Sequence, residues 1–347
     1  MTKRKILYCA STASHLRNFH LPYMQDLQSM GYYITACVNE PCVLPYADDI
    51  AVIPFHKQIT SIENIKNILR VYQLLKQEQY TAVSVHTTLA AAVVRAAILL
   101  MPKANRPKVL YTCHGYLFSK NDGLRKWKYL LPEKLCAKVT DVLMVMNKED
   151  KALAEQYKLY KKTGKLIPIP GMGVDFSRFD IAQSKQELRK HYGIAEDEVL
   201  YVFAGEFSNR KNQQMLIDAF ARAAAQMPKA RLILAGTGAL LEECKQQVQQ
   251  LHLEHQILFP GYVADMPVLY RMSDVCVSAS RIEGLPFNIM EAMYCQLPCI
   301  VSEVKGHKDL IAHGRNGCLC SDALQIAGYM LQTYQSPSLR KRLGSNA

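Results

Sequence analysis

Short apolar runs alternate along the chain with longer segments in which apolar residues recur every three or four positions. This alternation of buried strands with amphipathic helices is typical of α/β proteins with parallel sheets. In the first half it predicts strands at residues 5–10, 33–38, 82–86, 108–112 and 141–146. It also predicts helices there, one ending near Met30 after a loop at 11–22, and others at about 61–79, 89–101 and 148–157.

The same pattern starts again in the second half. Strands are predicted at residues 200–204, 231–235, 256–259, 275–278 and 299–302, with helices at about 213–226 and 266–272. Between the halves, residues 167–175 hold two prolines and two glycines, as a domain boundary commonly does. We therefore expect an α/β protein with two Rossmann-like domains, at residues 1–170 and 171–347.

Composition narrows the class of protein. With 347 residues and 49% hydrophobic content, the chain is long enough for two domains with separate cores. Residues 1–10 run directly into a strand pattern and hold no apolar stretch of signal-peptide length. The eleven cysteines are spread singly, and the pairs Cys295/Cys299 and Cys318/Cys320 lack zinc-type spacing and a second ligand pair. We expect a cytosolic protein with reduced thiols and no metal ligand set.

The net charge of +12 lies entirely in the first half. Residues 1–170 hold 24 Lys and Arg against 12 Asp and Glu, whereas residues 171–347 hold 18 of each. This excess indicates an anionic partner: an acidic membrane surface, a phosphorylated acceptor or nucleic acid. Residues 116–138 mix aromatic and aliphatic side chains with six lysines and arginines. A helix of this type either lies on an anionic bilayer or packs its apolar side into the core.

Residues 280–293 place two carboxylates on either side of a Gly-Leu-Pro corner. Pro286 suits the first position of a helix, so Glu283 would lie just outside that helix and Glu291 roughly 7.5 Å along its axis. The free N–H groups of a helix start bind phosphate. A nucleotide sugar, with its sugar, diphosphate and ribose, matches this order of carboxylate, anion-binding helix start and carboxylate. The other interpretation is a capped helix that carries a solvated glutamate.

Functional groups of α/β sheets gather where strands end. His114 follows one predicted strand. It is either a site residue or a loop histidine whose side chain holds the backbone in place. Arg210 and Lys211 lie between a strand end and a helix start, where they either bind a diphosphate or form a solvated basic pair. Leu241 breaks the Gly-x-Gly-x-x-Gly pattern that would begin at Gly236, which disfavours a nicotinamide enzyme. No phosphate-binding loop ending in Gly-Lys-Ser/Thr supports an ATP enzyme.

Motifs along nearly the whole chain carry a family resemblance. They are residues 19–22, His86 and Thr87 with Arg95, residues 111–116 and 133–135, Asp141 with residues 147–150, residues 171–175, Gly205 and Glu206 with residues 210–212, and residues 283–293. Together they resemble glycosyltransferase family 4, the retaining nucleotide-sugar transferases, and especially its members from bacterial capsule and exopolysaccharide loci. The resemblance implies a GT-B fold, in which two Rossmann-like domains with parallel sheets face each other across a cleft.

The resemblance also implies roles for single residues. Lys211 would bind the donor diphosphate with help from Arg210, Glu283 would contact the hydroxyls of the transferred sugar, and Glu291 would bind the ribose. The residues implied to hold the diphosphate at the helix start are Gly284, Leu285, Pro286 and Phe287. Those implied on the acceptor side are Arg17, His20, His86 and His114, of which His114 would act with Glu283 near the transferred sugar. Cations and helix-end amides would stabilise the departing diphosphate without a metal or other cofactor.

Three departures from the family pattern stand out. Glu206 replaces a common arginine, so either Arg210 compensates for its charge or Glu206 points away. Gln296 replaces the usual glycine after the Glu291 helix, and we expect roughly 1 kcal/mol of left-handed strain there if that geometry is kept. The chain also stops where relatives continue into a closing helix, so we expect either a truncated chain or a missing clamp.

These observations predict a cytoplasmic enzyme, peripheral at the inner face of the plasma membrane. It would transfer a sugar from a nucleoside diphosphate sugar, which we expect to be a UDP-sugar, to a polyprenyl-pyrophosphate-linked glycan. The reaction would serve capsule, exopolysaccharide or O-antigen biosynthesis. Two alternatives stay open: a sugar-nucleotide epimerase or hydrolase of the same fold, and a non-catalytic module that binds sugars or polyanions. A nucleic-acid partner is not expected, because no recognition motif accompanies the charge.

Overall fold

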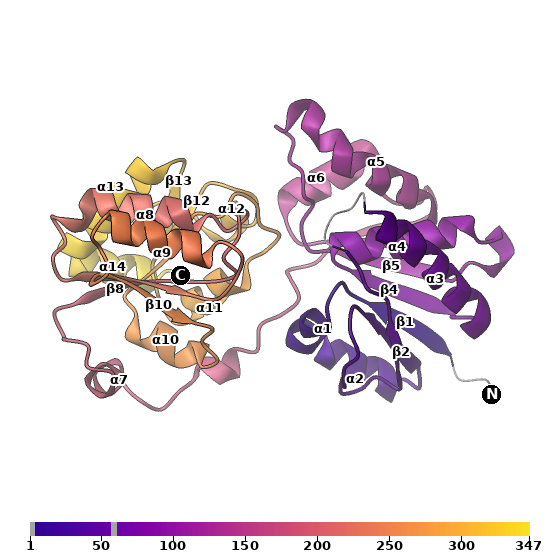
Figure 1. Ribbon diagram of the computed structural model, residues 1–347, viewed down its shortest axis with the longest axis horizontal. Coiled ribbons are helices and arrows are strands. Elements are labelled where there is room, and N and C mark those ends of the chain that lie inside the picture. Colours follow the sequence, from indigo (N-terminus) through magenta and orange to yellow (C-terminus); the bar gives the residue numbers. More distant parts are fainter. Residues whose placement is uncertain (1–3, 57–60) are drawn as a thin grey trace. The chain divides into compact units, whose positions relative to one another are not determined.

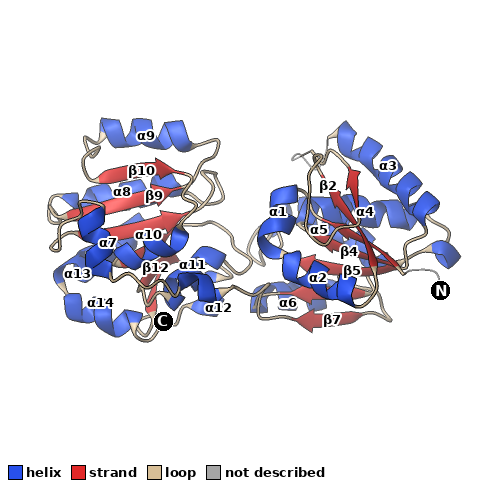
Figure 2. Cartoon of the chain, turned by 90° about the horizontal axis from the view of Figure 1, so that it is seen from below, coloured by secondary structure: helices blue, strands red, loops and turns tan. Residues whose placement is uncertain are grey.

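The computed structural model describes residues 4–56 and 61–347. The chain divides into two compact units, Met1–Gly173 and Val174–Ala347 (Figure 1). Each unit is a parallel sheet with helices packed against it, as the colouring by secondary structure in Figure 2 shows.

The first unit contains the strands β1 (Lys5–Cys9), β2 (Tyr33–Val38), β3 (Asp49–Val52), β4 (Ala82–His86), β5 (Lys108–Cys113), β6 (Val142–Val145) and β7 (Lys165–Pro168). Its α-helices are α1 (Ala13–Phe19), α2 (Leu21–Ser29), α3 (Ile62–Glu78), α4 (Thr88–Leu100), α5 (Trp127–Cys136) and α6 (Lys148–Tyr157). Three short 3-10 helices accompany them: η1 (Lys103–Asn105), η2 (Gly123–Lys126) and η3 (Ala137–Val139).

The second unit contains the strands β8 (Val199–Ala204), β9 (Ala230–Ala235), β10 (Ile257–Gly261), β11 (Val275–Ser278), β12 (Cys299–Ser302) and β13 (Gly317–Cys320). Its helices are η4 (Phe176–Phe179), α7 (Lys185–His191), α8 (Gln213–Ala224), α9 (Leu241–Gln250), α10 (Met266–Met272), α11 (Phe287–Tyr294), α12 (His307–Leu310), α13 (Ala323–Gln335) and α14 (Pro337–Gly344).

Strand order places a reversal point in each sheet. The first sheet has the order β3-β2-β1-β4-β5-β6-β7, and the second has the order β10-β9-β8-β11-β12-β13. The chain therefore winds in opposite directions from β1 and β4, and likewise from β8 and β11. At such a point the loops after the two central strands diverge and leave a crevice at the carboxyl ends, where doubly wound proteins bind ligands.

Both faces of each central strand are buried. Successive side chains of a strand point to opposite faces, so in β1 Leu7 enters one core and Tyr8 the other. In β8, Tyr201 and Val202 divide in the same way between two cores of the second unit. Burial on both sides explains why these strands read as continuous apolar runs in the sequence.

A buried ion pair joins two helices of the first unit. Arg95 of α4 and Glu133 of α5 are both buried, and Arg95 Nη2 lies 2.9 Å from Glu133 Oε2. Tyr111 of β5 donates its hydroxyl to Glu133 Oε1 at 3.1 Å. The guanidinium of Arg95 also lies over the Tyr111 ring, 3.9 Å from its centroid. Two of the segments that carried the family resemblance, 111–116 and 133–135, thus meet Arg95 in one structural network.

Most predicted elements are confirmed, and the predicted strands at 33–38, 82–86, 275–278 and 299–302 match residue for residue. The loop predicted at 11–22 is wrong, because α1 forms within it and is capped by Thr12, which accepts from the His15 N–H. The predicted boundary segment 167–175 begins with the end of β7. The amphipathic helix expected across 116–138 begins later, since η2, α5 and η3 together cover 123–139.

Gln296 adopts a φ of 57° in the turn after α11, so the left-handed geometry expected from the sequence is kept. We expect Gln296→Gly to raise the free energy of unfolding by about 1 kcal/mol, because glycine adopts this conformation without strain from a Cβ. Urea denaturation provides the measurement. Gln335→Gly, at the end of α13, is the control and should destabilise the protein; a similar loss in Gln296→Gly would contradict the prediction.

Candidate active site

Three predicted site residues meet at the reversal point of the second sheet. Lys211 and Arg210 follow β8, and Glu283 follows β11. The Lys211 ammonium lies 2.7 Å from Glu283 Oε1, and Arg210 Nη1 lies 2.9 Å from Glu283 Oε2. The interpretation as a solvated basic pair is therefore wrong for Lys211, which is buried, as is Glu283. Two cations share one carboxylate here, so the cluster retains positive charge for an anionic ligand.

The electrostatics of this cluster favour an ionised carboxylate. Burial alone would raise the pKa of Glu283, but the charges of Lys211 and Arg210 outweigh it and lower the pKa to about 2. For Lys211, burial lowers the pKa and the nearby Glu283 carboxylate opposes that shift. Arg210 pairs with Glu283 in this arrangement. Glu206, the residue with the unusual charge, is exposed, and its carboxylate still acts on the charge of Lys211.

Hydrogen bonds tie the loop after β8 to the loop after β11. Asn212 has a φ of 55° at the start of α8, and its side-chain amide donates to the Ala279 carbonyl at 3.2 Å. Arg281 donates from Nη2 to Asn212 Oδ1 and from Nε to the Asn209 carbonyl, both at 3.1 Å. The Arg281 N–H donates to the Arg210 carbonyl at 2.8 Å. These contacts fix the cations in position, and sequence spacing did not reveal them.

The loop after β12 closes against the same corner. Gly306 has a φ of 79°, and a Cβ on it would lie 2.7 Å from the Gly284 carbonyl oxygen. His307 follows and is buried, and its pKa is lowered to about 4 by burial, against the opposing charge of Glu283. His307 Nδ1 donates to the Ser302 carbonyl at 2.9 Å, whereas Nε2 finds no partner among the described residues. His307 was not predicted from the sequence, although a histidine after a strand end was the available signal.

The start of α11 lies next to Glu283 in the chain. Pro286 is the residue before the first helical position, so the helix begins one residue later than predicted. Pro286 itself makes no side-chain capping hydrogen bond. Asn288 donates its amide to the Ala204 carbonyl at 3.0 Å, which anchors the helix on β8. Glu291 is partly buried; burial raises its pKa and the charge of Arg178 opposes the shift.

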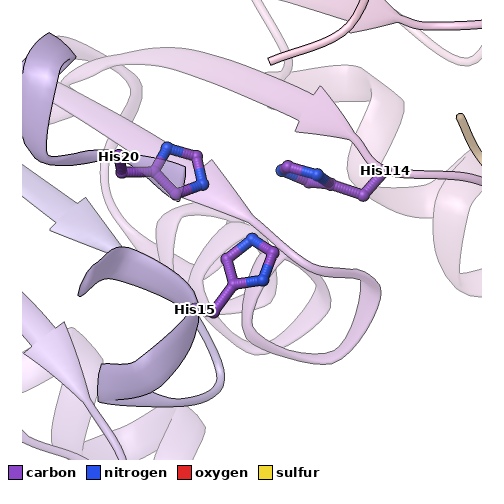
Figure 3. Close-up of side chains that lie close together, drawn as sticks. All are labelled: His15, His20 and His114. Carbon is purple, nitrogen blue, oxygen red and sulfur yellow. The ribbon is translucent and has the colours of Figure 1, made fainter. Parts of the chain in front are cut away.

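Four histidines gather at the reversal point of the first sheet. His15 and His20 follow β1, His86 ends β4 and His114 follows β5. Ring centroids lie 4.1 Å apart for His20 and His86, and 4.7 Å apart for His15 and His114. Figure 3 shows the rings of His15, His20 and His114 turned toward one another. The structure thus unites the predicted residues His20, His86 and His114, and it adds His15, which was not predicted from the sequence.

Burial keeps these rings neutral at pH 7. It lowers the pKa of His15 to about 4, of His114 to about 3 and of His20 to about 2, the last with help from neighbouring histidines. The pKa of His86 is lowered for the same reason. Arg17, the remaining predicted acceptor-side residue, is exposed and donates from Nη2 to the Val43 carbonyl at 3.1 Å.

Comparison with known proteins identifies the family. Residues 184–347 match the family model described as glycosyl transferases group 1, and residues 5–146 match the one described as glycosyl transferase 4-like. EpsD of Bacillus subtilis strain 168 is named as a glycosyltransferase, and the name gives neither donor nor acceptor. It is 32% identical over 99% of this chain and 91% of the EpsD chain. The chain belongs to glycosyltransferase family 4.

Further relatives of this glycosyltransferase agree with its fold and class. The UDP-Gal:alpha-D-GlcNAc-diphosphoundecaprenol alpha-1,3-galactosyltransferase of Escherichia coli is 31% identical over 76% of this chain and 68% of its own. Anabaena HepE, solved with UDP-glucose, has a TM-score of 0.77 at 20% identity and covers 99% of this chain and 93% of its own. WaaG, involved in lipopolysaccharide biosynthesis, has a TM-score of 0.78 at 16% identity and covers 98% of this chain and 93% of its own. These likenesses confirm the predicted GT-B fold.

Proposed function

We propose that this glycosyltransferase moves a sugar from a nucleoside diphosphate sugar, with UDP as the nucleotide, to a polyprenyl-pyrophosphate-linked glycan. The transfer retains the anomeric configuration and serves capsule, exopolysaccharide or O-antigen biosynthesis. The observation that carries this proposal is the pairing of Lys211 and Arg210 with one carboxylate, Glu283, at the reversal point of the second sheet. A departing diphosphate develops negative charge, and two prepositioned cations stabilise it without a metal ion.

Each predicted residue has a place in this proposal. The diphosphate competes with Glu283 for Lys211 and Arg210, which frees the Glu283 carboxylate to accept hydrogen bonds from hydroxyls of the transferred sugar. Glu291 binds the ribose. Residues 284–287 present the α11 start to the diphosphate. On the acceptor side, His114 contacts the transferred sugar, and Arg17, His20 and His86 serve the acceptor.

The names of two relatives support the substrate classes. The Escherichia coli relative uses UDP-Gal and a diphosphoundecaprenol-linked sugar by its name, and HepE was solved with UDP-glucose. The direct test is a calorimetric screen of UDP-, GDP- and ADP-sugars against the full chain. We expect a UDP-sugar to bind and its affinity to fall in Glu291→Ala. Absence of binding by every nucleotide sugar would contradict the proposal and favour a binding module of other specificity.

An exposed apolar face supports docking to a membrane surface. Leu124, Trp127, Leu131 and Leu135, here called the α5 stripe, are spaced by three, four and four residues and are 86%, 43%, 52% and 50% exposed. Exposed cations flank them: Arg125, Lys128, Lys134 and Lys138. The same helix also packs inward through Leu130 and Cys136, so both interpretations of its apolar residues hold in part. In residues 4–56 and 61–347, no helix is long and apolar enough to cross a bilayer.

We place the enzyme in the cytoplasm, peripheral at the inner face of the plasma membrane, and expect it to sediment with anionic vesicles. Lys128→Gln combined with Lys134→Gln should weaken this binding about 30-fold, because each lysine near an anionic surface contributes about 1 kcal/mol. The control, Lys190→Gln with Lys341→Gln, removes the same charge from the second unit and should leave binding unchanged. Equal binding to neutral vesicles, or an equal loss in the control, would contradict this mode of docking.

A further inference from the structure

The histidines of the first unit form a set of nitrogen ligands. His15, His20 and His114 each offer one ring nitrogen, and these three atoms lie within 4.8 Å of one another. The Nε2 atoms of all three are buried and find no hydrogen-bond partner among the described residues. Leaving a buried polar atom unpaired costs about 1–3 kcal/mol. The arrangement therefore calls for a partner that binds several imidazole nitrogens at once, and Figure 3 shows the three rings close together.

The surroundings orient His20 as a ligand. Its ring is fully buried and lies 4.1 Å from the His86 ring, between centroids, and Tyr8 Oη lies 3.0 Å from His20 Nδ1. When the His20 proton is on Nδ1 and is donated to Tyr8, the Nε2 lone pair points into the cluster. A hydrogen bond of this kind from the far nitrogen is the usual second contact of a metal-binding histidine. His86 is held separately, through Nε2 and the Ser84 hydroxyl at 2.9 Å.

We propose that His15, His20 and His114 bind one divalent transition-metal ion of the zinc class. Imidazole nitrogen suits Zn²⁺, Cu²⁺ and Ni²⁺, whereas Mg²⁺ and Ca²⁺ require oxygen ligands that this set lacks. Zn–N bonds of about 2.0–2.1 Å place tetrahedral ligand atoms roughly 3.3 Å apart, so the rings close by roughly 1.5 Å on binding. His15 and His114 are only partly buried, and rotation of their side chains supplies this movement. Three protein ligands leave the fourth position open.

Three imidazole nitrogens without a hydrogen-bond partner among the described residues suit a transition-metal ion, for which imidazole is a common ligand. The site belongs to the first unit and includes His20 and His114, which the proposed function places on the acceptor side. Its test measures bound metal rather than sugar transfer, so the two proposals can fail separately.

Metal binding is tested on the full chain without an affinity tag. The chain is dialysed against Zn²⁺ and its metal content is measured, and Co²⁺ is titrated while its visible absorption is followed. We expect one ion per chain and the intense bands of low-coordinate Co²⁺. His15→Gln with His114→Gln changes the two partly buried ligands and should lower the affinity at least 100-fold. Tyr8→Phe removes the contact behind His20 and should lower the affinity about 10- to 100-fold.

His255→Gln is the matched control, because His255 is an exposed histidine of the second unit. It should leave both the stoichiometry and the Co²⁺ spectrum unchanged. Circular dichroism and thermal melts check that each variant is folded, and Tyr8→Phe provides a conservative change if the double variant is not. The proposal is overturned if the wild type takes up less than one ion per chain, or if folded ligand variants bind as the control does.

Discussion

Lys211→Met should lower kcat/KM for donor turnover about 10²- to 10³-fold, which is the typical effect of removing one prepositioned donor from a developing anion. Lys211 is buried and contacts Glu283 at 2.7 Å, so methionine keeps most of its stem packing while removing the charge. Glu283 then retains Arg210 as its ion-pair partner, and the cluster loses one of the two positive charges available to the diphosphate. Steady-state kinetics with the UDP-sugar selected by calorimetry provide the measurement.

Lys185→Met is the matched control for this loss. Lys185 is a partly buried lysine of the second unit, and like Lys211 it pairs with a carboxylate, at 2.6 Å from Asp274. Its loss should reduce stability to a similar degree and leave kcat/KM within a few-fold of the wild type. If Lys211→Met is folded and turns over donor at the wild-type rate, Lys211 does not bind the diphosphate.

The largest loss of stability is expected from Glu133→Ala. This change leaves the buried Arg95 without its counter-ion and Tyr111 without its acceptor. Breaking one side of a buried pair costs about 3–5 kcal/mol, because the remaining charge is neither solvated nor paired. Urea denaturation of the chain measures the change in the free energy of unfolding.

Two further variants test whether the loss of stability comes from the unpaired charge or from lost packing contacts. Arg95→Met with Glu133→Leu removes both charges and should recover much of the stability, since apolar replacements of a buried pair are often neutral or stabilising. Lys66→Ala, which breaks the exposed pair with Glu63, should cost less than about 1 kcal/mol. A Glu133→Ala variant as stable as Lys66→Ala would show that the buried pair is not needed.

The fold could be predicted because its central strands are buried on both faces. Continuous apolar runs such as 275–278 and 299–302 leave few alternatives to a parallel sheet, and their bounds were predicted correctly. Short elements escaped prediction. With seven residues, α1 spans two turns and shows little periodicity, and in β3 (Asp49–Val52) no residue is fully buried, so its apolar signal is weak.

The site could be predicted only in part. Strand ends singled out Lys211, Glu283 and His114, because the carboxyl ends of parallel strands share one edge of a sheet. Sequence spacing does not encode which side chains pair across that edge. The ion pair of Lys211 with Glu283 joins residues 72 positions apart, and His15 meets His114 only because β1, β4 and β5 are neighbours in the sheet. These contacts depend on strand order, which the apolar pattern leaves open.

The most direct test of the proposed function is transfer to a lipid-linked acceptor. The full chain is incubated with the UDP-sugar that it binds and with an undecaprenyl-diphosphate-linked sugar, and the lipid products are analysed by mass spectrometry and by NMR of the new anomeric centre. We predict an acceptor-dependent product with retained configuration, which Glu283→Ala abolishes. Donor breakdown at an equal rate without acceptor would contradict transfer and indicate a hydrolase or an epimerase.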